Sequence, residues 1–483
     1  MASARQVALQ LLQRVQRDDS YVNLLLPTLL RQSSLDEADR GLVQELAYGA
    51  LRWQLQYDSF IDILAGGKAI EPDIRLILRL GMHQLLRMRI PSHAAINESV
   101  EQVKEIQPRA AGFANAILRN ADRRGYDQLL KDATEGKSRL EYLSMVYSHP
   151  QWVISVLSDA LELDGKSDIE ALLSSNNETP QINLAALTDS ATKKLAALGL
   201  KKSPVSPIGF IAAGNPEPLL DADIRVQDQG SQLVALAMLE LSDRSGVFLD
   251  MCSGPGTKSA VLLSGLSPQA KLVCFEPAPH RAKLVAQAVG DDGRVSIVTK
   301  MGQEAEKNSY DAVLLDAPCT GLGSLRRKPE SRWRKQPSQL RDLNRIQNEL
   351  LLAGLDALKS GGVLLYSTCS PVISETNTQI VDALQSRPDC ELIDIKLDDL
   401  EPDYSGQNTV FVTSVMCKEG VTKEDNQVME EDDNQKEENM VLDNSVEDLE
   451  KNRGEEINGL LMEIINHNPI VYDTLRSTNT HSP

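Results

Sequence analysis

The 483-residue chain contains no run of 18 apolar residues, so the sequence predicts no membrane-spanning helix. Its first ten residues hold no hydrophobic segment of the kind found in secretory signal peptides. The six cysteines form no Cys-x-x-Cys pair, and there are only six histidines. This scarcity argues against a zinc site or a disulfide scaffold. We therefore expect a cytoplasmic protein without metal or membrane partner. We also expect a monomer, although none of these absences bears on the oligomeric state.

Two common nucleotide-binding signatures are also missing. A Walker loop requires GxxxxGK[ST], which residues 256–259 do not complete, and no GxGxxG occurs. A different glycine turn, DMCSGPGTK at 250–258, follows the apolar run 246–249 and precedes a helical segment. Glycines admit a ligand close to the backbone, and a helix N-terminus offers free N–H groups. The turn therefore predicts a nucleoside-type ligand, with an ordinary tight turn as the alternative.

Taken alone, the net charge of −19 argues against a nucleic-acid partner, but the charge is unevenly distributed along the chain. From residue 418 onward, 17 acidic residues face six basic ones, and this segment, 418–483, is predicted to be a disordered acidic tail. Residues 1–140 carry 19 basic and 17 acidic residues. A denser basic run follows at Arg326, Arg327, Lys328, Arg332, Arg334 and Lys335. Next to a nucleic-acid site such a run would meet phosphates, whereas elsewhere it would be a solvated helix start.

The hydrophobic pattern divides the chain into three folded parts. Residues 1–140 show helical spacing, as in Val7, Leu11, Leu12 and Val15, which predicts an all-α domain. Residues 141–235 mix helix and strand signals and are predicted to form a small α+β connector. In residues 236–417, apolar runs alternate with helical segments, which predicts an α/β domain with a parallel, doubly wound sheet.

The helical part carries two recognisable segments. Residues 39–52 read DRGLVQELAYGALR, and residues 95–100 and 112–119 read AINESV and GFANAILR. These segments resemble the NusB-type RNA-binding fold. The resemblance, rather than composition, implies that residues 1–140 form a helical RNA-binding domain.

Two cysteines follow apolar runs that are predicted to be strands. Cys319 comes after residues 312–315, and Cys369 comes after residues 363–366. Sites in α/β folds lie beyond the carboxyl ends of parallel strands, so both thiols could face one site. A thiolate that attacks C6 of a pyrimidine makes C5 nucleophilic toward a methyl group, and the carboxylate of Asp316 could stabilise the adduct. The alternative is that both cysteines are buried apolar fillers.

Three motifs carry a second resemblance. They are DMCSGPGTK at 250–258, DAPCTGLG at 316–323 with RRKPESRW at 326–333, and YSTCS at 366–370 with Glu375. Together with VQDQGSQ at 226–232, they resemble the Sun-type RNA cytosine-C5 methyltransferases. With the NusB-like domain in front, the chain is similar to the bacterial members that act on small-subunit ribosomal RNA. The resemblance implies a Rossmann-like methyltransferase domain and S-adenosyl-L-methionine as cofactor.

The resemblance also implies roles for individual residues. Cys369 would be the nucleophile, Cys319 would serve product release, and Asp316 would lie between cofactor and base. The cofactor would lie against Cys252, Ser253, Gly254, Pro255, Gly256, Thr257 and Lys258. Glu276, at the end of the next strand, would accept hydrogen bonds from the ribose. Gln303, where the family usually has Asp, would hold the adenine edge, and Arg326, Arg327, Lys328 and Arg332 would bind RNA.

Three readings of the function follow from these expectations. The first is S-adenosylmethionine-dependent methylation of cytosine C5 in small-subunit ribosomal RNA through a covalent Cys–C6 adduct. The second is the same chemistry on transfer RNA. The third is a non-catalytic RNA-binding factor, against which both cysteines, Asp316 and the glycine turn argue.

Overall fold

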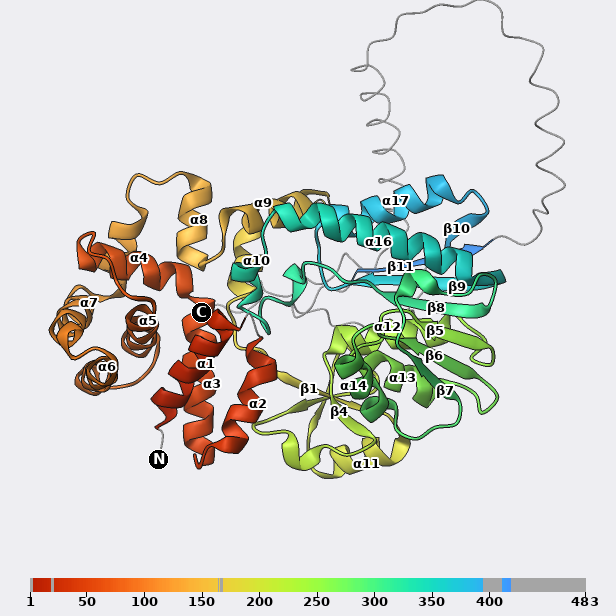
Figure 1. The fold of residues 1–483 in the computed structure, drawn as a ribbon, viewed down its shortest axis with the longest axis horizontal. Coiled ribbons are helices and arrows are strands. Elements are labelled where there is room, and N and C mark those ends of the chain that lie inside the picture. The colour runs from red at the N-terminus through yellow and green to blue at the C-terminus, as the bar shows by residue number, and fades with distance from the viewer. Residues whose placement is uncertain (1–2, 19–20, 164, 166–167, 394–410, 418–483) are drawn as a thin grey trace, which may run out of the picture. The chain divides into compact units, whose positions relative to one another are not determined.

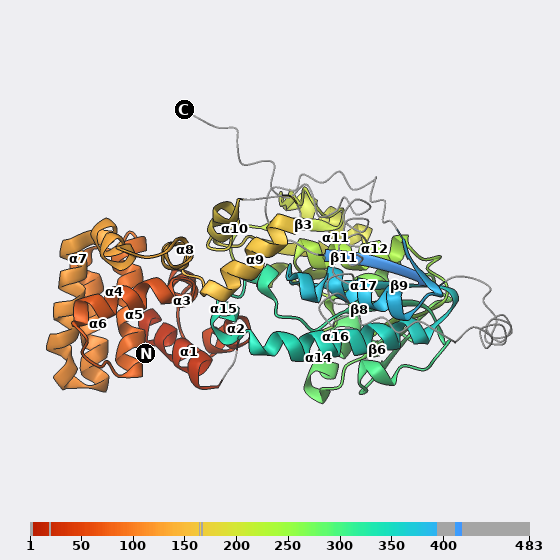
Figure 2. The same ribbon diagram turned by 90° about the horizontal axis from the view of Figure 1, so that it is seen from above.

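A computed structural model describes residues 3–18, 21–163, 165 and 168–393, together with the backbone of 411–417 (Figures 1 and 2). The chain forms two compact units. The first comprises Met1–Thr179 and Ser324–Pro337, and the second comprises Pro180–Gly323 and Ser338–Pro483. In the described residues, no helix is long and apolar enough to cross a membrane. The predicted disordered tail, 418–483, lies outside the described residues.

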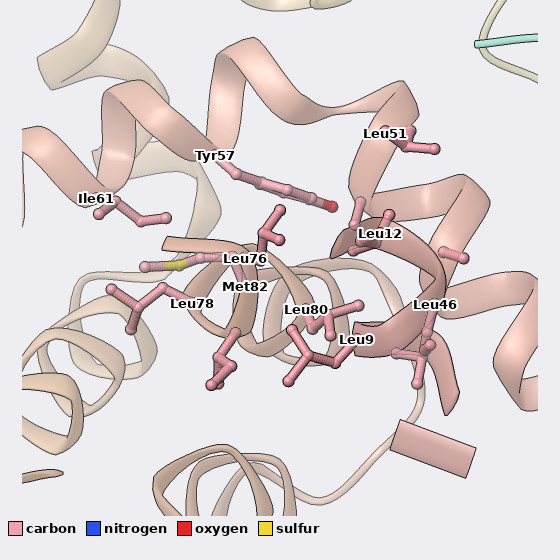
Figure 3. Packing of buried hydrophobic residues seen from close by; sticks show 14 of the residues in the cluster. Leu9, Leu12, Leu46, Leu51, Tyr57, Ile61, Leu76, Leu78, Leu80 and Met82 are labelled. Carbon is pink, nitrogen blue, oxygen red and sulfur yellow. The ribbon is translucent and has the colours of Figure 1, made fainter. Parts of the chain in front are cut away.

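The first unit is helical in its described residues, as predicted for residues 1–140. Its helices are α1 (Ala4–Arg17), α2 (Val22–Gln32), α3 (Glu37–Arg52), α4 (Gln54–Ala65), α5 (Pro72–Arg87), α6 (Ser92–Ile106), α7 (Ala111–Thr134), α8 (Arg139–Tyr147), α9 (Gln151–Leu163), α10 (Ile169–Ser175) and α15 (Ser331–Arg334), with a 3-10 turn η1 (Pro108–Ala110). Residues at helical spacing turn one face of each helix inward, and Figure 3 shows Leu12, Leu46 and Tyr57 in the resulting core. The Tyr57 hydroxyl lies 2.8 Å from His83 Nδ1, which gives this buried polar group a partner.

The boundary between the units differs from the predicted one. Residues 141–179 were expected in the connector, but they form most of α8 together with α9 and α10 of the first unit. Helix α8 packs against α4 and α7, which covers the buried side chains of Leu143 and Met145. The chain also returns to the first unit at Ser324–Pro337, which no sequence pattern indicated.

The second unit begins with the α+β part of the predicted connector. A four-stranded antiparallel sheet has the order β2-β3-β1-β4, with α11 (Asp189–Ala197) packed on it. Its strands are β1 (Ile182–Ala186), β2 (Lys201–Lys202), β3 (Gly209–Ala212) and β4 (Ile224–Val226), and a 3-10 turn η2 spans Glu217–Leu219. Helix α12 (Gln229–Glu240), capped by the Asp228 carboxylate, then leads into the larger sheet.

The larger sheet has seven strands in the order β10-β11-β9-β8-β5-β6-β7. Strands β5 (Val247–Asp250), β6 (Lys271–Phe275), β7 (Val295–Val298), β8 (Tyr310–Asp316) and β9 (Leu358–Thr368) are parallel, as predicted. Strand β11 (Phe411–Cys417) pairs antiparallel with β9 and with β10 (Cys390–Ile393). The strand order reverses between β5 and β8, which is where such sheets bind ligands.

Helices cover both faces of this sheet (Figure 1). On β8, Val313 and Leu315 pack against α16 (Ser338–Ala357) and α17 (Asn377–Ser386), whereas Ala312 and Leu314 face α12, α13 (Thr257–Gly265) and α14 (Pro279–Val289). The alternation follows from the two-residue period of a strand. Burial on both faces explains why these strands are continuous apolar runs in the sequence. The carboxyl ends of the strands carry the short turns η3 (Gly302–Glu304), η4 (Leu322–Ser324) and η5 (Ile373–Glu375).

Candidate active site

The site lies at the carboxyl ends of the adjacent parallel strands β8 and β9. Asp316 is paired with Ser367 in the sheet register, so the segments that follow leave the sheet side by side. We name them the Cys319 turn (residues 317–321) and the Cys369 turn (residues 369–372). Backbone bonds hold the chain together on either side of these turns, because Ala317 N donates to Ser367 O at 2.8 Å and Gly323 N donates to Cys369 O at 2.9 Å. Two segments fifty positions apart thus lie side by side and form one surface of the site.

The two predicted cysteines contact each other in this surface. Cys319 Sγ lies 3.3 Å from Cys369 Sγ, and both residues are half-buried. The hydrogen bond to Cys369 raises the pKa of the Cys319 thiol well above its ordinary value, and burial adds to the effect. Cys319 is therefore the thiol that keeps its proton while it faces Cys369. The contact agrees with the expectation that both thiols face one site, and their roles stay a prediction.

Asp316 and Lys258 form the charged part of the site. Lys258 Nζ lies 2.6 Å from Asp316 Oδ2, and the Ser367 hydroxyl donates to Asp316 Oδ1 at 3.2 Å. Burial would lower the pKa of Lys258, but the Asp316 carboxylate outweighs it and the net pKa is raised. The charge of Cys369 acts in the same direction. Lys258 is thus a stable cation next to both Asp316 and Cys369, a role that its position in the glycine turn did not reveal.

The glycine turn between β5 and α13 is built for close approach. Gly256 has φ of 99°, a left-handed conformation that favours glycine, and it caps the N-terminus of α13. A Cβ on Gly254 would overlap the carboxylate of Glu276. Arg281 joins these two residues, with Nε 3.3 Å from Glu276 Oε2 and Nη2 donating to Gly254 O at 2.7 Å. Glu276 therefore lies against the turn, as a ribose-binding residue requires.

Asp250, the last residue of β5, is a buried acid that sequence reasoning did not place in the site. Ser259 Oγ donates to its Oδ2 at 2.6 Å. Burial raises the pKa of Asp250 to about 6. The signal in the sequence was an acid at a strand end immediately before a glycine turn.

Gln303 lies in η3, beyond β7. Its Nε2 is 3.5 Å from Glu349 Oε2, whereas its buried Oε1 has no partner among the described residues. A buried acceptor of this kind is normally satisfied, and an N–H of a bound ligand would satisfy it. Together with the left-handed Gly256 and the buried Glu276, this orphaned acceptor fits the adenine and ribose ends of S-adenosylmethionine. Which of its groups Gln303 contacts stays a prediction.

The structure corrects the prediction for Arg326 and Arg332. Both side chains are buried in the first unit, and Arg332 is fully buried. Arg332 donates to Arg52 O, Ser148 O, Asn176 O and Asn177 Oδ1 at 2.9 to 3.3 Å. Arg326 Nε donates to Ser175 O at 2.9 Å. The backbone acceptors among these lie at the C-termini of α3, α8 and α10, where the partial negative charge of the helix dipole favours a cation.

The rest of the basic run is less buried. Lys328 Nζ lies 5.8 Å from the ring centre of Tyr21, and Arg327 is half-buried. Trp333 donates from Nε1 to Leu51 O at 2.7 Å. Phosphate contacts by Arg327 and Lys328 stay a prediction, whereas Arg326 and Arg332 serve the packing of the first unit. In the part of the chain that the structure describes, no three His, Cys, Asp or Glu side chains gather as a possible metal site.

Sequence comparison matches both parts of the chain. Residues 236–428 match the family described as 16S rRNA methyltransferase RsmB/F, and residues 2–123 match the NusB family. A methyltransferase of Mycobacterium tuberculosis is 38% identical over 402 residues, which are 80% of this chain and 87% of the relative. Ribosomal RNA small subunit methyltransferase B of Escherichia coli is 31% identical over 412 residues, covering 80% of this chain and 91% of the relative.

Among solved structures, the crystal structure of PH0851 superposes with a TM-score of 0.69 at 20% identity. The match covers 85% of this chain and 98% of that one, which supports the fold. The sequence matches to the methyltransferase and NusB families extend over the two parts of the chain in the order that the motifs predicted. The chain belongs to the 16S rRNA methyltransferase RsmB/F family, with a NusB domain in front, and uses S-adenosylmethionine as its cofactor.

Proposed function

We propose that the protein methylates C5 of a cytosine in small-subunit ribosomal RNA through a covalent bond between Cys369 and C6 of the base. The observation that carries the proposal is the pair of thiols 3.3 Å apart at the ends of β8 and β9, next to Asp316 and Lys258. A methyltransferase acting on a nucleophilic nitrogen or oxygen needs no thiol. An unactivated pyrimidine C5 does, because attack at C6 makes C5 nucleophilic.

Cys369 is the nucleophile in this proposal. Its thiolate forms a bond to C6, and the electron pair of the C5–C6 double bond moves toward N3 and the carbonyl of the ring. The ammonium of Lys258 favours the thiolate over the thiol. The Cys319 sulfur lies 3.3 Å from the Cys369 sulfur, so its S–H can donate to the thiolate and stabilise the same charge. The Asp316 carboxylate accepts a hydrogen bond from the exocyclic amine and orients the base.

S-adenosylmethionine, when bound, supplies the electrophilic methyl group that C5 takes up. Residues 252–258 approach it with their backbone, Glu276 accepts from its ribose hydroxyls, and Gln303 accepts from its adenine. These assignments are supported by the left-handed Gly256, the buried Glu276 and the orphaned Gln303 Oε1. They are tested by cofactor affinity, which Glu276→Gln should reduce.

Cys319 serves product release. Once Cys369 has become a thioether it is no longer a charged acceptor, so ionisation of Cys319, with its proton passing to solvent, becomes easier. The Cys319 thiolate then takes the C5 proton, the C5–C6 double bond forms again, and the Cys369–C6 bond breaks to return the thiolate. The base must leave its stack to reach these thiols, so a flipped or single-stranded cytosine is the substrate.

The proposal is tested by bisulfite sequencing of ribosomal and transfer RNA from cells with and without the protein. A protein-dependent 5-methylcytosine in small-subunit ribosomal RNA is the expected result. The same mark in transfer RNA only would identify the alternative substrate, and no mark would favour a non-catalytic RNA-binding factor. The monomeric state and the cytoplasmic location stay predictions.

A further inference from the structure

A buried carboxylate lies behind the two thiols and belongs to neither cysteine turn. Glu375, in η5, is fully buried and accepts four hydrogen bonds. Its Oε1 accepts from Thr320 N at 2.8 Å and from Gln347 Nε2 at 3.0 Å. Its Oε2 accepts from Thr320 Oγ1 and from Ser370 Oγ, each at 2.5 Å. Glu375 is therefore bonded to the residue after Cys319 and to the residue after Cys369.

Other bonds complete this arrangement. Gln347 Nε2, on α16, also donates to Pro318 O at 2.8 Å, so the same amide holds the residue before Cys319. The hydroxyls of Thr320 and Ser370 lie 2.9 Å apart. The Tyr366 hydroxyl donates to Glu375 O at 2.8 Å and fixes the backbone of η5. All four donors to the carboxylate are neutral, so the negative charge of Glu375 is stabilised by hydrogen bonds rather than by a cation.

The charges around the two thiols are unequal. Cys319 faces the Cys369 sulfur and the carboxylates of Glu375 and Asp316. Lys258 acts on Cys369 and is bonded to Asp316. A carboxylate near one thiol disfavours its ionisation, and a cation near the other favours it. This asymmetry can decide which of two neighbouring cysteines attacks and which keeps its proton.

We propose that Glu375 is a positioning residue of the two-thiol site, which ties the Cys319 turn to the Cys369 turn and keeps Cys319 protonated so that Cys369 is the nucleophile. The proposal rests on the proposed function for its catalytic meaning, but its physical content concerns the thiols alone. The hydrogen bond to Cys369 and burial raise the pKa of Cys319 most, and the charge of Glu375 acts in the same direction. Removal of the charge should therefore make Cys319 more reactive and leave the cysteines of the glycine turn and β6 unchanged.

The test is alkylation of the full-length protein by iodoacetamide between pH 7 and 10, with each cysteine followed by mass spectrometry of its peptide. In Glu375→Gln the hydroxyls of Thr320 and Ser370 can turn and accept from the amide, so the fold is retained. At pH 8 we expect Cys319 to react about tenfold faster than in the wild type, which corresponds to one pKa unit. Cys252 and Cys274 should react at wild-type rates. Asp311→Asn, which removes a carboxylate bonded to Lys359 and Val247 N, is the matched control.

Two further variants keep the test decisive. Glu375→Asp retains the charge and should restore slow alkylation of Cys319, which a purely structural role would not require. If Glu375→Gln does not fold, Thr320→Val is the substitute, because it removes the side-chain bond that holds the Cys319 turn beside the carboxylate. Cys319 can then move away from the negative charge and should react about two- to threefold faster. Wild-type alkylation rates in folded Glu375→Gln, or in Thr320→Val where only that variant folds, overturn the proposal. Alkylation needs neither RNA nor cofactor, so this result is independent of whether cytosine is the methylated base.

Discussion

Two fully buried charged side chains, Arg332 and Glu375, each join several segments of the chain, but they have opposite signs and belong to different units. Arg332 is bonded to four neutral acceptors in the first unit. Glu375 is bonded to four neutral donors in the second. Convergent peptide and side-chain dipoles thus stabilise an interior charge of either sign. The difference lies in the neighbourhood, because only Glu375 acts on a reactive group.

The first prediction separates the two turns by their chemistry and has the largest effect. Cys369→Ala should lower RNA methylation on the order of 10⁴-fold, because the nucleophile is lost, while cofactor affinity stays within about twofold. Methylation is measured by transfer of labelled methyl groups to RNA, and affinity by calorimetry. Cys274→Ala, a buried cysteine of β6, is the matched control and should remain active. Normal methylation by Cys369→Ala would show that the nucleophile has been misassigned.

Cys319→Ala should block the reaction at a later step than Cys369→Ala does, which distinguishes the roles of the two cysteines. Without Cys319 the adduct between Cys369 and RNA should accumulate and turnover should fall at least about 10²-fold. A slowly migrating protein–RNA band on a denaturing gel detects it. The band should vanish in the Cys319→Ala/Cys369→Ala double variant. A complex that dissociates fully in denaturant would contradict the release role.

Features of the fold and the site could be predicted where their signal lies within one short stretch of the sequence. The five parallel strands and the two cysteines were predictable, because apolar runs of strand length and strand-end motifs are local features of the sequence. The partners of Glu375 were not, because Thr320 and Gln347 come from other segments, 55 and 28 positions away in sequence. Arg332 was misassigned for the same reason. A run of arginines looks alike whether phosphates or helix C-termini accept its hydrogen bonds.

Arg332→Met tests the buried cation. Loss of the guanidinium leaves several buried carbonyls without a donor, so we expect the first unit to lose about 3 kcal/mol of unfolding free energy. All three tryptophans, Trp53, Trp152 and Trp333, belong to this unit. Tryptophan emission in urea therefore reports its unfolding separately. Arg109→Met, at an exposed position, is the control and should change stability by less than about 0.5 kcal/mol. If Arg332→Met and Arg109→Met unfold at the same urea concentration, Arg332 does not stabilise the first unit, and its predicted role in RNA binding would stand.

A third buried charge, Asp250, extends the comparison to a carboxylate with few donors. Among the described residues, its one side-chain donor is Ser259, and burial raises its pKa to about 6. Between about pH 4 and pH 6 the folded state therefore binds a proton that the unfolded state has released. By linkage the stability of the second unit falls as pH rises through this window, by roughly 2–3 kcal/mol.

Asp250→Asn removes that titration and should improve in stability relative to the wild type by this amount between pH 4 and pH 7. The measurement is urea unfolding followed by circular dichroism at both pH values, with tryptophan emission as an internal control for the first unit. Other carboxylates titrate equally in both proteins, so only the difference between them is informative. A difference that stays constant with pH would mean that Asp250 is ionised in the folded protein. Its single side-chain donor would then hold an interior charge as well as the four donors of Glu375 do.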